Sequence, residues 1–165
     1  MKIAHFGATG NVGSRIVAEA LQRGHEITAI APNPEKLKPH PKLTLQIGDV
    51  NNQPDVARFA ASHDAVINSV KFQLIHPAIL IEGVKQANVK RLLVVGGAGT
   101  LEVAPGVQLL DTPDFPEAYK PEALGGREFL NILRAEKSLE WTFLCPPPQQ
   151  NLWVDSSGSG SRPNV

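Results

Sequence analysis

The sequence predicts an α/β fold, a doubly wound parallel sheet with helices on both faces. Short apolar runs alternate with amphipathic stretches along the 165 residues, and this alternation is typical of right-handed βαβ units. The apolar runs are continuous, which is the pattern of strands buried on both faces. With 42% hydrophobic residues the chain can bury one core, so we expect a single domain.

The first helix has the clearest pattern in the first half of the chain. Val17, Ala20 and Leu21 recur at helical spacing on one face, and Gly24 follows as a left-handed C-terminal cap. In order, this half is predicted to form a strand over residues 2–6, this helix over 12–23, strands over 26–31 and 43–47 joined by a helical turn over 35–38, a helix over 54–62 and a strand over 64–70.

The second half continues the same alternation less regularly. Pro77 suits the first turn of a helix, because its ring already has the helical φ angle and it lacks an N–H that would stay unpaired there. The remaining predicted elements are a helix over residues 77–88, a strand over 91–96, a helix over 121–137 and a strand over 141–145.

Two segments break the alternation. Residues 97–120 are rich in Pro and Gly and predict a long loop, of the kind that forms lids and binding loops. Residues 149–165 contain SSGSGS, which has the composition of a flexible linker, and we expect this tail to be disordered. Residues 1–148 are therefore the predicted domain.

Charge and cysteine content limit the classes of partner. Lys+Arg and Asp+Glu both number 16, so no net charge attracts the chain to nucleic acid or to a membrane surface. The single cysteine, Cys145, cannot form an internal disulfide, and no run of about 18 apolar residues occurs. We expect a cytoplasmic monomer or homodimer whose partners are small molecules.

Three glycines, Gly7, Gly10 and Gly13, stand between the first strand and the first helix. A Rossmann-type dinucleotide-binding fold places its pyrophosphate at this point. Gly7 permits the sharp turn, Gly10 lets the backbone approach the phosphates, and Gly13 lets the helix pack closely on the sheet. The Gly-Lys-Ser/Thr of a nucleoside triphosphatase loop is missing, and a purely structural turn is the remaining alternative.

The motif GATGNVG, followed by PNPEKL, GDV, DAVINSV, VKRLLVVGGAG and WTFLCPP, resembles the atypical short-chain dehydrogenase/reductase superfamily. The similarity is to its NAD(P)H-binding, NmrA-like, NADH-flavin-reductase-like and biliverdin-reductase-B-like branches, and it implies a dinucleotide and a small-molecule acceptor as ligands. The cofactor-binding residues that it implies are Gly7, Thr9, Gly10, Asn11, Val12 and Gly13 for the pyrophosphate, Asp49 and Val50 for the adenine, and Ser69, Val70, Lys71, Gly96 and Gly97 for the ribose and nicotinamide.

Asp49 has a second interpretation. A carboxylate after the third strand can accept a hydrogen bond from the adenine amino group. The surrounding GDVNNQPD is also dense in turn formers and helix-start residues, so both interpretations stay open.

The end of the second strand bears on the choice between NAD and NADP. An acidic residue there would bind the ribose 2′-hydroxyl of NAD, whereas an arginine would bind the 2′-phosphate of NADP. This chain has Pro32 and Asn33 instead, where many similar proteins have an arginine at the first position. Lys36 and Lys38 either reach a 2′-phosphate or are solvated surface residues. The missing acid favours NADP(H).

Active members of the superfamily commonly use Tyr-x-x-x-Lys, in which the lysine lowers the pKa of the tyrosine. Tyr119 is the only tyrosine, and Ala123 occupies the position of the lysine. Tyr119 and, in place of the usual serine, Thr100 are the candidate catalytic residues, with packing as the alternative role of Tyr119. The five histidines have no paired metal-ligand spacing, so no metal site is predicted.

Three functions are consistent with these observations. The first is an NAD(P)H-dependent oxidoreductase that transfers a hydride to a flavin or quinone, because that chemistry needs no protein nucleophile. The second is a non-catalytic NAD(P)-binding sensor of the NmrA-like type. The third is a nucleotide-sugar epimerase or dehydratase, which the missing lysine disfavours.

Overall fold

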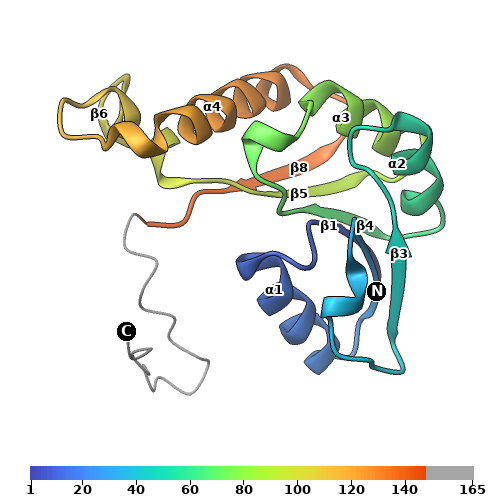
Figure 1. Ribbon diagram of the computed structural model, residues 1–165. Helices are drawn as coiled ribbons and strands as arrows, with labels where there is room; N and C mark the ends of the chain where they lie inside the picture. Colours follow the sequence, from blue (N-terminus) through green and yellow to red (C-terminus); the bar gives the residue numbers. More distant parts are fainter. Residues whose placement is uncertain (148–165) are drawn as a thin grey trace, which may run out of the picture.

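A six-stranded parallel sheet with the order β3-β2-β1-β4-β5-β8 runs through the centre of the protein (Figure 1). The computed structural model describes residues 1–147. Strand β1 lies between β2 and β4, so the strand order reverses there and the predicted doubly wound sheet is confirmed. The strands are β1 (Lys2–Phe6), β2 (Glu26–Ala31), β3 (Leu43–Ile47), β4 (Ala65–Asn68), β5 (Arg91–Val95) and β8 (Glu140–Leu144).

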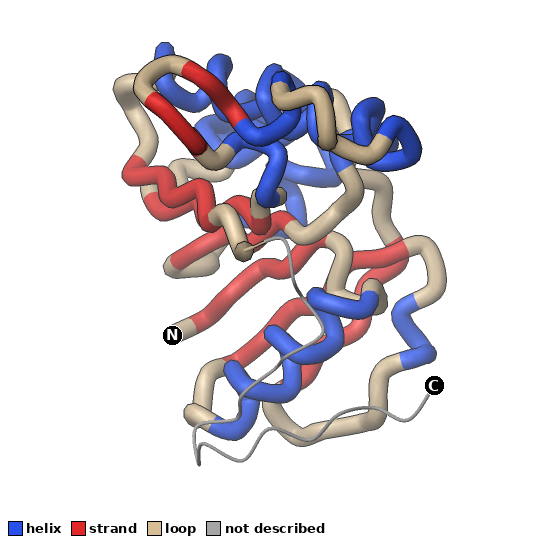
Figure 2. Tube along the Cα trace, turned by 90° about the vertical axis from the view of Figure 1, so that its left-hand side faces the viewer, coloured by secondary structure: helices blue, strands red, loops and turns tan. Residues whose placement is uncertain are grey.

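Helices cover both faces of the sheet, with α1 on one face and α2, α3 and α4 on the other (Figures 1 and 2). The chain moves outward from β1 to β3 and then returns past β1 to β4. Because the crossovers are right-handed, this change of direction places the later helices on the opposite face. The helices are α1 (Asn11–Gln22), α2 (Gln53–Ala60), α3 (Pro77–Gln86) and α4 (Lys120–Ala135).

Helix α1 ends as the sequence predicts. Gly24 has a φ of +83°, a value that residues with a Cβ rarely adopt. Its N–H donates to the carbonyl of Leu21, and the next N–H, of His25, donates to the carbonyl of Ala20. This pair of bonds is a Schellman motif, which satisfies the last carbonyls of the helix.

Two hydrophobic cores lie on the two faces of the sheet, the larger one between the sheet and α2, α3 and α4. Three aromatic rings, Phe72, Phe129 and Phe143, meet within the larger core, with centroids 5.7 to 6.4 Å apart. Phe72 belongs to the short 3-10 helix η2 (Phe72–Leu74), which follows β4. The cluster therefore anchors the segment beyond β4 to α4 and β8.

The predicted long loop, residues 97–120, contains regular structure. A short antiparallel hairpin is formed by β6 (Glu102–Ala104) and β7 (Val107–Gln108). Pro105 and Gly106 form its turn, and Gly106 has a φ of +74°, as the third residue of a type II turn requires. The segment also includes the 3-10 helices η3 (Ala98–Thr100), η4 (Leu109–Asp111) and η5 (Glu117–Tyr119).

The predicted tail, residues 149–165, lies outside the described residues. The boundary of the predicted domain at residue 148 therefore stays a prediction. Within residues 1–147, none of the helices combines the length and the apolar character that crossing a membrane would require.

Candidate functional site

The glycine loop joins the end of β1 to the start of α1 and is held by backbone bonds. Gly7 has a φ of +83°, and its N–H donates to the carbonyl of Ile30 on β2 over 3.2 Å. The N–H of Gly10 then donates to the carbonyl of Gly7 over 3.1 Å, closing a tight turn. The loop thus turns at the carboxyl edge of the sheet, where open α/β sheets bind ligands.

Two of the three glycines have no room for a side chain. A Cβ at Gly13 would lie 2.1 Å from the carbonyl oxygen of Gly7, and a Cβ at Gly7 would lie 2.8 Å from the backbone of Ser69 and Val70. Without these side chains, α1 packs directly against the turn. This short distance confirms the prediction that Gly13 lets the helix pack closely.

The start of α1 has the features of an anion site. Its N-cap residue is Gly10, which offers no side-chain cap, and the first intrahelical bond is made by the N–H of Ser14. The N–H groups of Asn11, Val12 and Gly13 precede that bond, so they have no intrahelical acceptor. Together with the positive end of the helix dipole, they suit a pyrophosphate.

Two side chains, of His5 and Ser69, form hydrogen bonds that hold the glycine loop against β1 and β4. His5 is fully buried on β1, and its Nε2 lies 2.9 Å from Oγ of Ser69, at the end of β4. The same hydroxyl lies 3.1 Å from the carbonyl of Gly7 and 3.3 Å from that of Phe6. Because its single proton goes to one of these carbonyls, Ser69 accepts from Nε2–H, which assigns the tautomer of His5.

Burial lowers the pKa of His5 from its ordinary value of 6.5 to about 4, because the imidazolium would lose its hydration. The ring is therefore neutral at pH 7. Its other nitrogen, Nδ1, has no hydrogen-bond partner among the described residues. Protonation there would place an unpaired charge in the core, so burial keeps the ring neutral.

The residues expected to bind the adenine and its ribose follow β2 and β3. Pro32, Asn33 and Lys36 are exposed after β2. Asp49 is exposed after β3, and one of its carboxylate oxygens accepts the N–H of Asn51 over 2.9 Å. Val50 is buried within the larger core. Asp49 thus has the turn-forming role that the sequence offered as one interpretation. Because its side chain is also exposed, it remains accessible to an adenine amino group.

A cavity of about 480 Å³ lies beside α1. It runs along α1 from Ser14 to Gln22 and is bordered on the other side by residues 36–40 and Leu43. Its charged lining residues are Lys36 and Lys38, and no carboxylate lines it. The two lysines therefore give this cavity a positive charge.

The ends of β4 and β5 form the other half of the site. The N–H of Gly96 donates to the carbonyl of Leu144 over 2.7 Å, which fixes the end of β5 against β8. A Cβ at Gly97 would have no atom within 4 Å, so open space adjoins this residue. Ser69 and Val70 are partly exposed and Lys71 is exposed. The structure brings these residues and the glycine loop to one edge of the sheet.

Two residues that the sequence analysis missed hold η2 in place. The carboxylate of Glu122 on α4 accepts the N–H groups of Phe72 and Gln73 over 2.8 and 3.2 Å. Asn51 donates to the carbonyl of Leu74 and accepts the N–H of His76, both over 2.8 Å. No local pattern announces these contacts, because each joins parts of the chain that are far apart in the sequence.

The candidate catalytic residues lie in different environments. Tyr119 is 66% exposed at the start of α4. Thr100 is buried, and its hydroxyl donates to the carbonyl of Gly97 and lies 3.1 Å from Sγ of Cys145. Ala123 occupies the lysine position of the motif and packs against η3. A Cβ added to Gly99 would lie only 2.7 Å from the Cβ of Ala123. The structure therefore does not bring a tyrosine and a lysine together there.

Metal-ligating side chains do not gather within residues 1–147. No group of three or more His, Cys, Asp or Glu residues in this range is placed to hold an ion. The predicted dinucleotide-binding residues lie after β1, β2, β3, β4 and β5, at the carboxyl edge of the sheet.

Comparison with known proteins identifies the family. The sequence profile described as NAD(P)H-binding matches residues 7–153. The chain belongs to this NAD(P)H-binding family. Family membership and the glycine loop together support a protein that binds a nicotinamide dinucleotide, and they confirm the resemblance to the atypical short-chain dehydrogenases/reductases.

Individual relatives agree with the family assignment. The uncharacterized protein YwnB of Bacillus subtilis (strain 168) is 38% identical, and the match covers 88% of this chain and 71% of YwnB. The structure of a candidate epimerase from Bacteroides thetaiotaomicron is 38% identical with a TM-score of 0.84, over 90% of this chain and 71% of that one. A candidate NADH-flavin reductase from Streptococcus pneumoniae TIGR4 is 35% identical with a TM-score of 0.73, over 88% and 71%.

Substituting Gly13→Ala should displace α1 from the glycine loop. The added Cβ would overlap the carbonyl of Gly7, so we expect a loss of about 1–3 kcal/mol in the free energy of unfolding and loss of the stabilisation by NADPH. Urea unfolding and thermal shift would measure both. Gly97→Ala, which enters open space, is the stability control, and an unchanged Gly13→Ala protein would contradict the packing argument.

The stability of the protein should fall as the pH is lowered from 6.5 to 4. In this window the unfolded chain binds a proton at His5 and the folded protein does not, so protons favour unfolding. The loss should reach about 3 kcal/mol relative to a His5→Leu variant, measured by urea unfolding across this range. His40→Leu, at an exposed histidine, should follow the wild type. Equal slopes for wild type and His5→Leu would show that His5 is not the titrating group.

Proposed function

We propose that this protein is an NAD(P)H-dependent oxidoreductase that transfers a hydride to a small acceptor such as a flavin or a quinone. The observation that carries the proposal is the uncapped start of α1 beside the glycine turn, at the strand-order reversal, in a chain of the NAD(P)H-binding family. The similarity to a candidate NADH-flavin reductase supports the choice of acceptor.

The residues of the chain have separate tasks in this proposal. The backbone from Thr9 to Gly13 binds the pyrophosphate, and Asp49 with Val50 borders the adenine. The segment 69–71, with Gly96 and Gly97, positions the nicotinamide. When bound, the reduced nicotinamide supplies the hydride, and the protein supplies orientation and exclusion of water.

The proton balance does not require the missing tyrosine–lysine pair. A hydride acceptor such as a flavin or a quinone takes its proton from solvent or from an exposed acid. Tyr119 is the proposed acid, because its phenol is exposed at the start of α4. Thr100 has no part in proton transfer in this proposal, and it positions Gly97 by donating a hydrogen bond to its carbonyl. Alcohol or sugar chemistry would need a lowered tyrosine pKa, and Ala123 cannot supply it.

A non-catalytic NAD(P)-binding sensor is the second candidate. Ala123 packs against η3 where a catalytic lysine would stand, so the site lacks the usual proton-transfer pair. An epimerase, the description of the Bacteroides relative, is disfavoured by the same observation. In either case we propose a cytoplasmic monomer or homodimer without nucleic acid or membrane partners, in agreement with the balanced charge.

The decisive experiment follows the oxidation of NADPH and NADH with FMN, riboflavin and menadione as acceptors. We expect turnover with at least one acceptor, and its loss in Gly13→Ala. Thermal shifts with NADPH, NADH and ATP measure binding in the same preparation. Binding without turnover, together with dinucleotide-dependent capture of a partner, would indicate the sensor, and a shift with ATP alone would refute both candidates.

We also propose a preference for NADP(H). No acid stands at the end of β2, and Lys36 and Lys38 line the cavity beside α1. Lys36→Glu should weaken NADPH binding about three- to tenfold, a modest change because the lysine is exposed, and should leave NADH binding nearly unchanged. Titration calorimetry with both cofactors tests this, with Lys90→Glu at the opposite edge of the sheet as the control. Equal effects on both cofactors would contradict it.

A further inference from the structure

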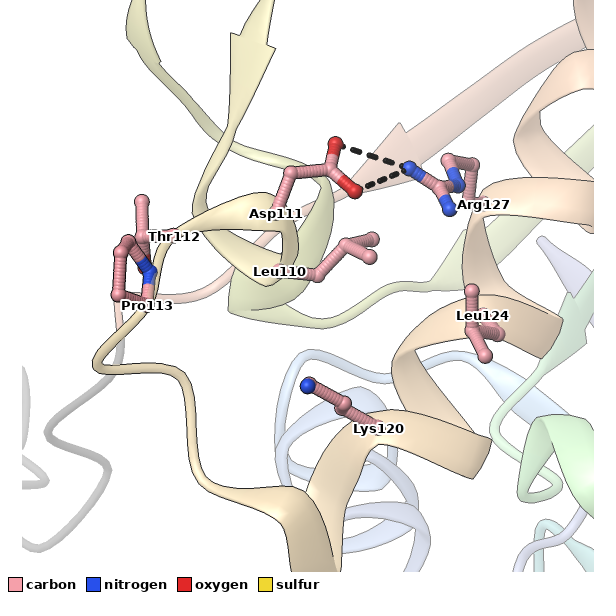
Figure 3. Close-up of a pocket in the computed structure, with 7 residues that line it drawn as sticks. All are labelled: Leu110, Asp111, Thr112, Pro113, Lys120, Leu124 and Arg127. Carbon is pink, nitrogen blue, oxygen red and sulfur yellow. Dashed lines mark hydrogen bonds and ion pairs between the residues drawn. The ribbon is translucent and has the colours of Figure 1, made fainter.

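A separate cavity of about 400 Å³ lies between two walls (Figure 3). One wall is η4 and the two residues that follow it, and the other is the beginning of α4. Lys120, Leu124 and Arg127 recur at helical spacing on one face of α4 and line one wall. Leu110 and the segment 111–113 line the other. The volume lies within the range of small-molecule sites, and the dinucleotide residues named above are not among the lining residues.

This cavity is close to the proposed nicotinamide position. Its buried wall residue, Leu110, packs against η3, since a Cβ at Gly99 would lie 3.4 Å from that of Leu110. Gly99 follows Gly97 by two residues, just beyond the end of β5. The helix that carries Lys120 also binds η2 through Glu122. Leu110 therefore connects the lining of the cavity to the segment that follows β5.

The charges of the lining favour an anion. Arg127 donates through Nη1 to both carboxylate oxygens of Asp111, over 2.8 and 2.9 Å, as Figure 3 shows. Lys120 pairs with Glu117, whose side chain is 83% exposed. An exposed pair of this kind is weak, so a ligand can replace Glu117. Lys120 and Arg127 balance Glu117 and Asp111 in the free protein, so a ligand anion that displaces the exposed Glu117 would meet one net positive charge, and the start of α4 adds its positive dipole.

Apolar side chains complete the lining. Leu110 is buried, whereas Leu124 is 46% exposed. An exposed leucine facing a cavity beside two cations is suited to a ligand that combines an apolar part with a charged group. An entirely polar ion would leave the exposed side chain of Leu124 without an apolar contact.

We propose that this cavity is an acceptor subsite, which holds the anionic substituent of a flat, reducible acceptor while the ring lies at the nicotinamide. The proposal rests on the proposed oxidoreductase function and adds a substrate class to it. Phosphate and sulfonate groups share the required chemistry. Lys120 is the residue that meets the anion, and Asp111 is the residue that limits its affinity.

Equilibrium binding tests the subsite without turnover. Quenching of flavin fluorescence, with NADP⁺ present, gives the affinities of FMN, which carries a phosphate, and of riboflavin, which does not. We expect FMN to bind more tightly. Lys120→Gln should weaken FMN about three- to tenfold and Asp111→Asn should strengthen it about two- to fivefold, because the two changes alter the local charge in opposite directions. Riboflavin should respond to neither.

Lys90→Gln is the matched control, since it removes an exposed lysine at the opposite edge of the sheet. Circular dichroism of each variant establishes that it is folded. A second pair of acceptors compares 1,2-naphthoquinone-4-sulfonate, which carries a sulfonate, with menadione, which carries no charge. Together with the FMN and riboflavin pair, it shows whether the cavity prefers a sulfonate or a phosphate. An anion preference in either pair that Lys120→Gln removes supports the subsite.

The outcomes separate this inference from the proposed function. If NADPH is oxidised but neither pair shows a Lys120-dependent anion preference, the subsite is wrong and the oxidoreductase stands. If the preference is present but no acceptor is reduced, the cavity binds anionic ligands, and both the oxidoreductase and the role of the cavity as an acceptor subsite are wrong. Equal effects of Lys120→Gln on charged and neutral acceptors would overturn the subsite, since a structural disturbance would explain them.

Discussion

The close contact between α1 and the end of β1 is the constraint on which the candidate site depends. Gly13 lies so near the carbonyl of Gly7 that no side chain fits between them. Ser69 bonds to the same carbonyl from β4, so α1, β1 and β4 meet around one oxygen. This contact places an uncapped helix start where the strand order reverses, and an anion-binding helix end at that position is the basis of dinucleotide binding in open α/β sheets.

Helix α4 supports the segments that follow β4 and β5. Its first turn binds η2 through Glu122, and the neighbouring face of the same turn lines the cavity proposed for the acceptor. Since α4 also packs on η3, beyond β5, the segments that follow β4 and β5 share one support. A change in α4 can therefore alter acceptor binding while the pyrophosphate loop, held by β1 and α1, stays intact.

The strands were the most predictable part of the fold. Those over residues 2–6, 26–31 and 43–47 have the predicted bounds, because each is a short run rich in apolar residues between polar turns. The hairpin within residues 97–120 was missed, since β6 and β7 are short and mostly exposed and lack the apolar pattern of a buried strand. The Pro-Gly dipeptide at its turn was the available signal.

The sequence by itself determined the fold class, the glycine loop and the NAD(P)H-binding family, because these depend on local periodicity and on residues adjacent in the chain. Only the tertiary structure decided which side chains support the site. His5 meets Ser69 across 64 positions, and Glu122 meets Phe72 across 50. The cavity beside Lys120 exists only because η4 folds back against α4. Such contacts depend on how elements cross in space, and no local pattern encodes that crossing.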